Sequence, residues 1–395
     1  MHPKFNKYKI GELFEVQLGK MLDERAKKGE QVDYLANFNV RWGAFDFSKL
    51  NQMNFSEKEK EKFSLICGDL LMCEGGEIGR CAVWKDERAN IYYQKALHRI
   101  RAKSTKCTTN YLSLYFQYLA QTGQLTKFVG ESSIAHLTRE TLIGLHIFCP
   151  TLVEQKAIAG LLATWDEAIE KTERLIQAKE RKFKHLLNTL ICLPTDNGKW
   201  KETRLKNLFE ERRETNREDL PLLSITNNEG VIYREDTNRK DTSNDDKSKY
   251  LRICPGDIGY NTMRMWQGVS ALSSLEGVVS PAYTICIPGE KVDPKFIAFL
   301  FKVPFMIHRF YRHSQGLTSD TWNLKFHHFG EVKMPLPSLA EQQKIAELLE
   351  ASQKEMSFLK LLAEKYKSQK RGLMQKLLTG QWRVKSEVIK RYGEQ

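Results

Sequence analysis

The stretch Pro150-Thr-Leu-Val-Glu-Gln-Lys-Ala-Ile-Ala-Gly-Leu-Leu162 occurs a second time, with changes, as Pro337-Ser-Leu-Ala-Glu-Gln-Gln-Lys-Ile-Ala-Glu-Leu-Leu349. The offset between the copies is a constant 187 residues, and no gap is needed as far as Leu190 and Leu377. A match of this length indicates an internal duplication. Because the period is far longer than that of solenoid repeats, each repeat is expected to be a domain followed by a helix.

Both copies have the pattern of a long helix. Apolar or small side chains recur at alternating steps of four and three, which is typical of a coiled-coil seam. The residues spaced as a capping box at the helix starts are Thr151 with Glu154 and Ser338 with Glu341. The expected stops are Leu193-Pro194 and Thr379-Gly380. Each helix would hold about forty residues and measure roughly 60 Å.

The bulky residues of the first helix predict how the two helices pair. Trp165 and Phe183 are too large for a narrow seam, and their equivalents in the second copy are Ser352 and Lys370. In an antiparallel pair whose facing residue numbers sum to 535, Trp165 faces Lys370 and Phe183 faces Ser352. We therefore predict antiparallel pairing, with packing of each helix on a separate core as the alternative. The expected interface residues are Ile158, Leu162, Trp165, Ile169, Ile176, Phe183, Leu359, Tyr366, Lys370 and Leu373.

The segments between the long helices predict two similar domains of the α/β class, more closely α+β. Both contain short β-like runs and turns, and helices are expected at 111–121 and 294–310. Asp69 and Asp257 follow glycines in matching segments, which indicates a structural turn. The expected organisation is a first domain at 1–150, a helix at 151–195, a second domain at 196–336, and a second helix with a tail at 337–395.

The charge of the chain favours a polyanionic partner. The 395 residues carry a net charge of +13, with a pI of about 9.2. Residues 1–150 and 337–395 each contribute +5, so no single tail holds the excess. Solubility alone is the alternative explanation of this charge.

No catalytic, cofactor or metal site is predicted. The chain has no Gly-x-x-x-x-Gly-Lys-Ser/Thr loop for ATP and no Asn- or Asp-Pro-Pro-aromatic run of a base methyltransferase. The eight cysteines include no Cys-x-x-Cys pair, and reduced thiols in a cytoplasm are expected. The start of the chain does not resemble a signal peptide, and the most apolar stretch is too short to span a membrane. The histidines expected in loops or cores are His308, His313, His327 and His328.

Several short stretches of the sequence have a composition suited to binding nucleic acid. Basic and aromatic residues interleave in several short stretches, and such side chains reach base edges and phosphates. Each stretch is also compatible with an ordinary surface strand, and only their recurrence in both domains favours binding. The predicted DNA-binding residues are Arg80, Trp84, Lys95, Ser133 and His136 in the first domain, and Arg264, Trp266, Gln267, Thr318 and Trp322 in the second.

The repeated helix start and the ending Lys370-Arg-Gly-Leu-Met-Gln-Lys-Leu-Leu-Thr-Gly380 resemble the specificity subunit of type I restriction-modification systems. The resemblance implies two target recognition domains, each followed by a conserved spacer helix, and antiparallel pairing of the helices. Each domain would read one half of a split, asymmetric target in double-stranded DNA. Two modification (methyltransferase) subunits would dock on this chain, and restriction subunits with translocase and endonuclease activity would join them.

The resemblance assigns every cofactor to those partners. S-adenosylmethionine, ATP and magnesium would be bound by the partner subunits, and none by this chain. The first copy departs from the family pattern because it lacks a glycine stop directly after Leu193. The expected function is thus a DNA-recognition subunit without catalytic activity. The alternatives are the specificity chain of a fused type IIB-like restriction system, an enzyme with divergent motifs, and a protein scaffold that binds no DNA.

Overall fold

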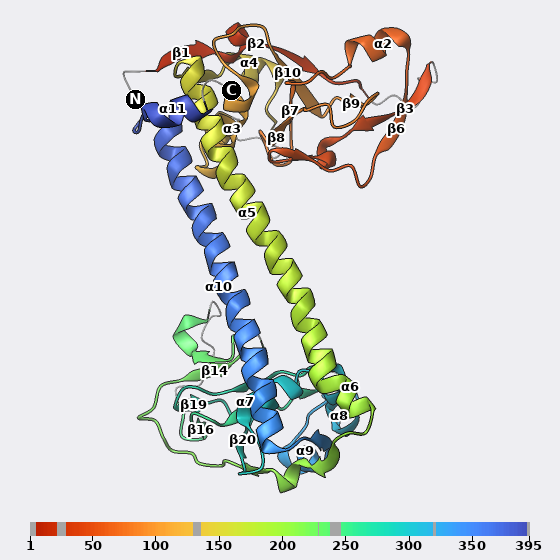
Figure 1. The fold of residues 1–395 in the computed structure, drawn as a ribbon, viewed down its shortest axis with the longest axis vertical. Helices are drawn as coiled ribbons and strands as arrows, with labels where there is room; N and C mark the ends of the chain where they lie inside the picture. Colours follow the sequence, from red (N-terminus) through yellow and green to blue (C-terminus); the bar gives the residue numbers. More distant parts are fainter. Residues whose placement is uncertain are drawn as a thin grey trace. The chain divides into compact units, whose positions relative to one another are not determined.

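The computed structural model describes residues 5–21, 29–128, 136–227, 229–237, 246–318 and 321–392. The chain divides into two compact units (Figure 1), which we call unit 1 (residues 1–173 and 361–395) and unit 2 (residues 174–360). Each unit has its own sheets and hydrophobic core and contains a part of both long helices. No helix among the described residues is long and apolar enough to cross a membrane.

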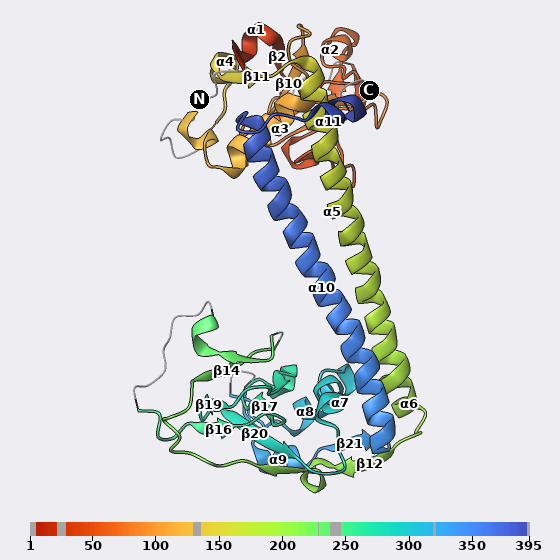
Figure 2. The ribbon, with the colours of Figure 1, turned by 60° about the vertical axis from the view of Figure 1, so that its left-hand side comes forward.

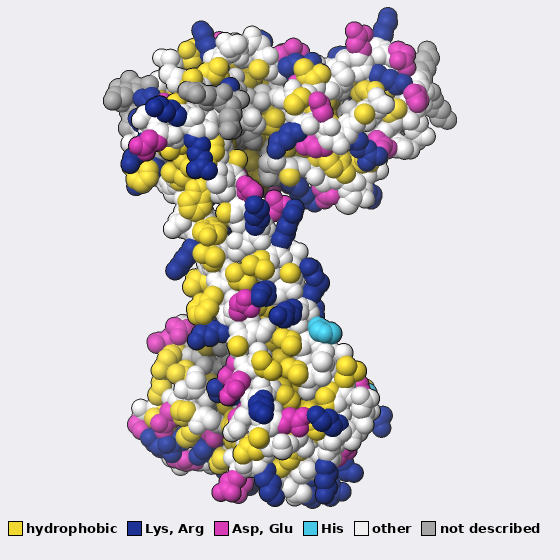
Figure 3. Space-filling model, in the orientation of Figure 1, with side chains coloured by type: hydrophobic (Ala, Val, Ile, Leu, Met, Phe, Trp, Pro, Cys, Tyr) yellow, Lys and Arg dark blue, Asp and Glu magenta, His cyan; other side chains and the backbone are white. Residues whose placement is uncertain are grey.

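The two long helices are α5 (Leu152–Leu187) and α10 (Leu339–Leu378), so the prediction of two long helices is confirmed. The end of α10 follows the prediction, because Gly380 adopts a φ of 70°, a conformation in which glycine avoids the steric penalty of a side chain. Hydrophobic side chains are exposed along both helices (Figure 3).

The predicted stop of the first helix at Pro194 is wrong. A π turn (Asn188–Cys192) follows α5, and the short helix α6 (Leu193–Asp196) continues the path with Pro194 in its first turn. A proline is tolerated there because the first N–H groups of a helix have no intrahelical partner. The helical path ends at Gly198, with a φ of 66°. The glycine that ends the helix in the family pattern is therefore present in the first copy as Gly198, a few residues after the expected stop at Pro194.

The glutamine of the first helix start ties α5 to its own unit. The side-chain amide of Gln155 donates to the carbonyls of Lys106 (2.8 Å) and Pro150 (3.0 Å). Its oxygen accepts the N–H of Thr108 (3.0 Å), the N-cap of α3 (Thr109–Gln121). The side chain is fully buried, so these bonds satisfy backbone groups that water does not reach.

The second copy repeats this arrangement in unit 2. Gln342 donates to the carbonyls of Lys291 and Pro337, both at 3.0 Å. Its oxygen accepts the N–H of Asp293 at 2.8 Å, and Asp293 is the N-cap of α7 (Pro294–Leu300). The repeated glutamine is thus a structural clamp between each long helix and the helix of its domain.

Only half of each predicted capping box forms. The hydroxyl half consists of Glu154 N–H with Thr151 Oγ1 and Glu341 N–H with Ser338 Oγ, each at 3.4 Å. The carboxylates turn away, and Glu154 binds Arg383 while Glu341 binds Lys199. Hydrogen bonds between charged groups are stronger than those to a neutral N–H. The glutamates therefore hold the segment that follows the other long helix in the same unit.

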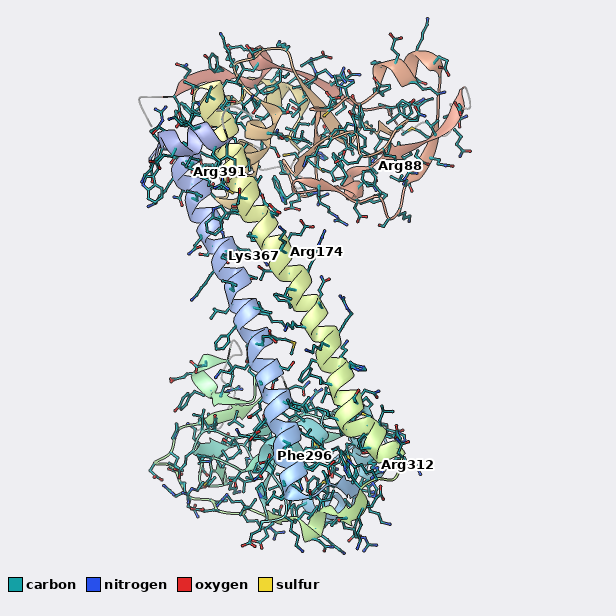
Figure 4. All side chains as sticks on the ribbon, viewed as in Figure 1. Arg88, Arg174, Phe296, Arg312, Lys367 and Arg391 are labelled. Carbon is teal, nitrogen blue, oxygen red and sulfur yellow. The ribbon has the colours of Figure 1, made fainter. Side chains whose placement is uncertain are left out.

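Within unit 1, α5 and α10 pair antiparallel, as predicted. Lys370 binds Asp166 at 2.5 Å and Lys367 binds Glu173 at 2.9 Å, so one residue number falls as the other rises. Figure 4 shows Lys367 on α10 beside α5. Lys370 is buried, and its ammonium group is neutralised by Asp166, the residue that follows Trp165 in the sequence.

The residue of α10 that Trp165 contacts lies one helical turn away from the predicted partner. The ring of Trp165 packs edge-to-face against Tyr366, with ring centroids 5.8 Å apart. Lys370, the predicted partner of Trp165, lies one turn further along α10 and binds Asp166 instead. An edge-to-face aromatic pair is favourable beyond its buried area, which accounts for the bulk of Trp165. Toward the end of the pair, Ile158, Leu162 and Leu373 join the core of unit 1.

Within unit 2 the helices are also antiparallel. Glu180 binds Lys360 at 2.8 Å, whereas Lys199, which follows α6, binds Glu341 at the start of α10. Phe183 packs against Phe299 at 6.2 Å between ring centroids. The remaining predicted interface residues are only partly buried, namely Ile169 of unit 1 and Ile176 and Leu359 of unit 2.

Unit 1 is built around a four-stranded antiparallel sheet. Its order is β2-β10-β7-β8, and α3 packs on it. The strands are β2 (Phe14–Leu18), β10 (Leu97–Ala102), β7 (Leu70–Cys73) and β8 (Cys81–Val83). A strand pair joins β1 (Asn6–Lys9) and β11 (His146–Cys149).

Unit 1 also contains a second sheet, a hairpin and four short helices. The second sheet contains β6 (Asn51–Phe55), β3 (Glu30–Leu35) and β9 (Tyr92–Tyr93). The hairpin is formed by β4 (Val40–Arg41) and β5 (Ala44–Phe45). The shorter helices are α1 (Ile10–Leu13), α2 (Glu57–Lys62), α4 (Arg139–Gly144) and α11 (Ser386–Tyr392).

Unit 2 repeats the main sheet in the order β13-β20-β17-β18. The strands are β13 (Phe209–Glu211), β20 (Tyr283–Pro288), β17 (Ile258–Asn261) and β18 (Ser270–Leu272). The pair β12 (Lys201–Arg204) with β21 (Lys333–Leu336) corresponds to β1 with β11. Further pairs are β14 (Leu223–Ile225) with β15 (Val231–Tyr233) and β16 (Leu251–Ile253) with β19 (Gly277–Val279). The α/β class and the internal repeat are therefore confirmed.

The helix predicted at 294–310 is divided in two. α7 ends at Leu300, and α8 (Pro304–His313) begins a few residues later. The break precedes Pro304 because a proline disfavours the helical conformation of the residue before it, and Val303 is extended with a ψ of 146°. The last helix of the domain is α9 (Phe326–Glu331).

The matching turns at Asp69 and Asp257 have the structural role that the sequence predicts. Asp69 accepts the N–H of Ile66 and binds Arg101 through two hydrogen bonds of 2.7 Å. Asp257 accepts the N–H of Cys254 and binds Arg212 at 2.7 and 3.1 Å. Both carboxylates are buried, and their oxygens bind one N–H of the turn and one arginine from another strand segment.

Candidate nucleic-acid interface

Two loops of unit 2 meet at one edge of its main sheet. The first is the turn between β17 and β18, residues 262–269, and the second is the loop 314–324 that precedes α9. The N–H of Leu324 donates to the carbonyl of Thr262 at 2.8 Å and joins the two loops. Gln315 and Asn323 pair as an antiparallel bridge that closes the second loop.

A cluster of aromatic rings covers this junction. Trp322 packs edge-to-face against Trp266 at 5.2 Å and against Tyr311 at 5.0 Å between ring centroids. The indole N–H of Trp266 donates to the carbonyl of Met263, which orients the ring. Neither tryptophan is fully buried. The cluster therefore offers ring faces and edges at the surface, where bases can stack or a thymine methyl can pack.

Polar and basic side chains surround the cluster. Arg264 and Gln267 project from the turn, and Arg312 lies at the end of α8 (Figure 4). Among the residues that the structure describes, neither Arg264 nor Arg312 forms an ion pair. Leu317, at the tip of the second loop, is fully exposed. Guanidinium and amide groups of this kind bind base edges and phosphates.

The residues predicted for this domain all belong to the two loops. Arg264, Trp266 and Gln267 lie on the turn, and Thr318 and Trp322 lie on the second loop. The structure brings the two tryptophans into contact. Their binding to DNA stays a prediction.

Sequence reasoning missed the contribution of α8 to this surface. His308, Tyr311 and Arg312 are exposed and have the spacing i, i+3 and i+4, which places them on one face of the helix. That spacing was a signal that could have identified them.

The histidines near the second loop form no metal site. No group of three or more metal-binding side chains occurs within the described residues. His327 and His328 have ring centroids 3.9 Å apart. Burial and the neighbouring His327, His313 and Lys325 lower the pKa of His328.

The described residues of unit 1 repeat the contact between the turn and the segment before the short helix at the corresponding edge of the sheet. The turn between β7 and β8, residues 74–80, contacts the segment before α4 through the N–H of Leu137 and the carbonyl of Glu74 at 2.8 Å. This bond is the counterpart of Leu324 with Thr262. His136 is exposed beside it. Ser133 lies outside the described residues.

Two of the predicted residues of unit 1 have structural roles instead. Trp84 is only 1% exposed and packs edge-to-face against Phe45 at 5.2 Å; the prediction of a surface contact for it is therefore corrected. Arg80 binds Glu77 and the backbone and side-chain oxygens of Asn37, so its guanidinium group is used within the unit. An interleaved basic and aromatic pattern does not distinguish such strand residues from surface residues. Lys95 is exposed and stays a prediction.

An exposed hairpin of unit 1 was not predicted. The hairpin of β4 and β5 carries Arg41 and Trp42, and Phe38 just before it is 42% exposed. The indole of Trp42 donates to Glu77 at 2.5 Å, so the hairpin adjoins the turn 74–80. Their arrangement resembles the aromatic and basic surface of unit 2, although it uses a different segment of the chain.

The fold and the paired loops define a class of protein with two similar α/β domains, in which the framework is repeated and the loop surfaces differ between the domains. Comparison with known proteins identifies the family. A family model described as "Type I restriction modification DNA specificity domain" matches residues 3–180 and again residues 197–365. The chain belongs to this family, and the resemblance inferred from the sequence is confirmed.

Known relatives agree with this assignment. A protein of Methanocaldococcus jannaschii named for the MjaX specificity subunit of a type I restriction enzyme is 22% identical over 381 residues, which is 86% of this chain and 85% of the relative. The S subunit structure from M. genitalium has a TM-score of 0.58 at 15% identity and covers 95% of this chain and 97% of that chain. The HsdS subunit from Thermoanaerobacter tengcongensis has a TM-score of 0.50 at 13% identity, with coverages of 97% and 98%. At these identities the solved structures are evidence for the fold.

Proposed function

We propose that this chain is the sequence-specific DNA-binding subunit of a type I restriction-modification complex and that it reads a bipartite, asymmetric target with one domain per half-site. The observation that carries the proposal is the repetition of one loop pair in two units with different side chains. The framework bonds are kept, as in Leu137 with Glu74 and Leu324 with Thr262. The exposed residues around them differ, which is expected of two domains that read different sequences.

The composition of the surface supports binding to DNA. The aromatic and basic residues of unit 2 can contact base edges, while arginines on the same surface can contact phosphates. Phosphate contacts release counterions, so affinity should fall steeply with salt. The net charge of +13 also favours binding to DNA, because it attracts the negatively charged duplex.

We assign the long helices the role of a spacer. α5 has 36 residues and α10 has 40, which corresponds to roughly 54 and 60 Å at about 1.5 Å per residue. One turn of duplex DNA is about 34 Å. Helices of this length can therefore set a gap of more than one turn between two half-sites.

The same helices would bind the partner subunits. On α10, Leu348 and Phe358 of unit 2 are 55% and 60% exposed, and Leu361 of unit 1 is 53% exposed. Large apolar side chains on a solvent-facing helix are typical of a binding surface. We propose that two modification subunits dock there, that restriction subunits join them in the cytoplasm, and that S-adenosylmethionine, ATP and magnesium are bound by those partners.

The proposal is tested by exchanging one domain at a time. Methylome sequencing of a host that carries the complete system should reveal a two-part methylated motif. Replacing residues 1–150 with those of a relative should change one half of that motif, and replacing residues 196–336 should change the other half. A change of both halves in either exchange would contradict the division of labour between the domains.

A binding measurement separates this function from its alternatives. Fluorescence anisotropy with a duplex that contains the motif should show an affinity that decreases with salt, in the presence of the modification subunits. A chain that binds those subunits but no duplex at any salt concentration would be a protein scaffold. Turnover of DNA by the purified chain alone would identify an enzyme.

A further inference from the structure

The segment that follows α10 returns to the start of α5 within unit 1. Arg383 binds the buried carboxylate of Glu154 through hydrogen bonds of 2.7 and 2.5 Å, and the N–H of Val384 donates to the same carboxylate. Val384 packs against the core of unit 1. The chain is thereby anchored just before the last helix, α11.

α11 then lies along α5. Its half-buried residues are Val388, Ile389 and Tyr392, which share one helical face. The ring of Tyr392 rests on Gly160, and its hydroxyl lies 3.1 Å from Thr164 Oγ1. Figures 1 and 2 place α11 beside the first turns of α5, and Figure 4 shows Arg391 on it. The segment therefore covers the face of α5 that runs from Glu154 to Thr164.

Gly160 is adapted to this contact. A Cβ atom at residue 160 would lie 2.7 to 2.9 Å from three atoms of Tyr392, which is closer than side-chain atoms approach. A glycine inside a helix is unfavourable relative to alanine. Its presence in α5 is explained by the close approach of Tyr392.

The equivalent face of α10 in unit 2 is open. At the offset of 187 residues, Glu347 stands in place of Gly160, Leu348 in place of Leu161, and Ala351 in place of Thr164. Leu348 is 55% exposed, whereas Leu161 packs against the core of unit 1. Among the described residues of unit 2, no helix takes the place of α11, because the chain enters β12 after Gly198.

We propose that α11 is a displaceable cover on one of two equivalent helix-docking faces. The open face on α10 would accept a helix of the first modification subunit, and the covered face on α5 would accept the second only after α11 leaves. This inference rests on the proposed function, because that function supplies the partner. It adds that the two docking sites on one chain differ in their affinity for the modification subunit.

The occupant of the open face is an amphipathic helix with basic residues beside its apolar stripe. α11 itself is of this kind, with Lys390 and Arg391 beside Val388 and Ile389. The open face combines exposed Leu348 with Glu347, which forms no ion pair among the described residues, so it is complementary to such a helix. α11 has seven residues, too few for stability in isolation, so its contacts with α5 alone keep it folded and a longer helix can replace it.

The test is a titration of the chain with the modification subunit of the same system, followed by native mass spectrometry and calorimetry. The full chain should bind two subunits with unequal affinities. A chain that ends after Lys385 keeps Arg383 and Val384 but lacks α11, and its weaker site should bind at least tenfold more tightly. Gly160→Leu should have the same effect with α11 still present, because the new side chain displaces Tyr392.

A matched variant on α10 locates the stronger site. Leu348→Glu should weaken the first binding event and leave the second unchanged. Two equal affinities in the full chain, or weaker second binding after removal of α11, would overturn the inference while leaving the proposed function intact. An absence of binding in every form of the chain would refute the docking of modification subunits itself.

Discussion

The two units use the same framework to present different surfaces. In unit 1 the turn 74–80 contains Glu74, Glu77 and Arg80, and its charges are largely paired within the unit. In unit 2 the equivalent turn contains Arg264 and Trp266, which remain available beside Trp322. The repeated bonds therefore maintain the framework of each domain, whereas the loop residues around them differ between the two units.

The two tryptophans that the sequence does not distinguish provide the largest expected contrast. Trp84→Ala should lower the free energy of unfolding by about 4 kcal/mol, because it removes a fully buried aromatic side chain. Trp266→Ala should lower it by less than about 1 kcal/mol, because the ring is partly exposed. Urea denaturation followed by circular dichroism measures both values. Loss of DNA binding without loss of stability in Trp84→Ala would restore the original prediction for that residue.

The glutamine clamps should behave alike in the two units. Gln155→Ala and Gln342→Ala each leave three backbone groups without a partner, and each should cost about 3 kcal/mol of unfolding free energy. Hydrogen exchange should show that the loss of protection is confined to the unit that carries the change.

Two exposed neighbours serve as the controls for the glutamine clamps. Lys156→Ala and Gln343→Ala occupy equivalent positions and should be nearly neutral. A clamp variant that leaves its own unit as protected as these controls would show that the repeated glutamine is not structural.

The aromatic cluster of unit 2 should contribute to DNA affinity. Trp266→Ala should weaken binding to the cognate duplex by about 2 kcal/mol, or roughly thirtyfold, through the loss of base contacts. Arg312→Ala should reduce the slope of log affinity against log salt by about 1. Both are measured by fluorescence anisotropy in the presence of the modification subunits.

The control for the aromatic cluster is Trp382→Ala, since Trp382 is exposed on the segment after α10. It should leave DNA affinity unchanged. Equal losses in Trp266→Ala and Trp382→Ala would argue against a base contact at the cluster.

The glutamates of the helix starts differ in burial, and the smallest effect of all is expected at Glu341. Glu154→Gln should lower the free energy of unfolding by about 2 kcal/mol. The neutral amide cannot make the charge-assisted hydrogen bonds that the buried carboxylate forms with Arg383. Glu341→Gln should cost less than about 0.5 kcal/mol, because its pair with Lys199 is more exposed. Thermal unfolding at two salt concentrations distinguishes them, since only the exposed pair should be screened. Equal costs would indicate that burial of Glu154 has no energetic consequence.

Sequence reasoning identified the features that depend on repetition and period. The offset of 187 residues located both helix starts, and the steps of four and three predicted the two long helices that the structure contains. The bulky residues of the first helix predicted their antiparallel pairing. This reasoning placed Trp165 against Lys370, but the ring contacts Tyr366 one turn away. A period specifies which face of a helix is buried, but side-chain shape sets the final contact.

Prolines were harder to interpret than the repeat. Pro194 was expected to end a helix, yet a π turn allows the path to continue as far as Asp196. Pro304 was placed inside one helix, and it begins a second helix instead. The same residue can end, begin or interrupt a helix, because its effect depends on whether the neighbouring carbonyls find other partners.

For the candidate binding surface, the residues predicted in unit 2 all lie on two loops that meet, whereas those predicted in unit 1 do not form one surface. Arg264 and Trp266 were identified from their interleaved basic and aromatic pattern, and the structure places them in the turn between β17 and β18. Trp84 was misassigned because it is buried in a second core of unit 1, against which Phe45 packs, and no local sequence pattern indicates this burial. The hairpin at Arg41 was missed for the converse reason, since its exposure depends on strands distant in sequence.

The family, the duplication, the two helices and the basic character of the chain follow from residue order, because periodicity, spacing and charge are properties of the linear chain. The burial of Trp84, the meeting of Trp266 with Trp322, and the cover that α11 forms on Gly160 follow from folding alone. Each of these features joins segments far apart in the sequence, and their contacts exist only when both sides are held by the packed cores of the units.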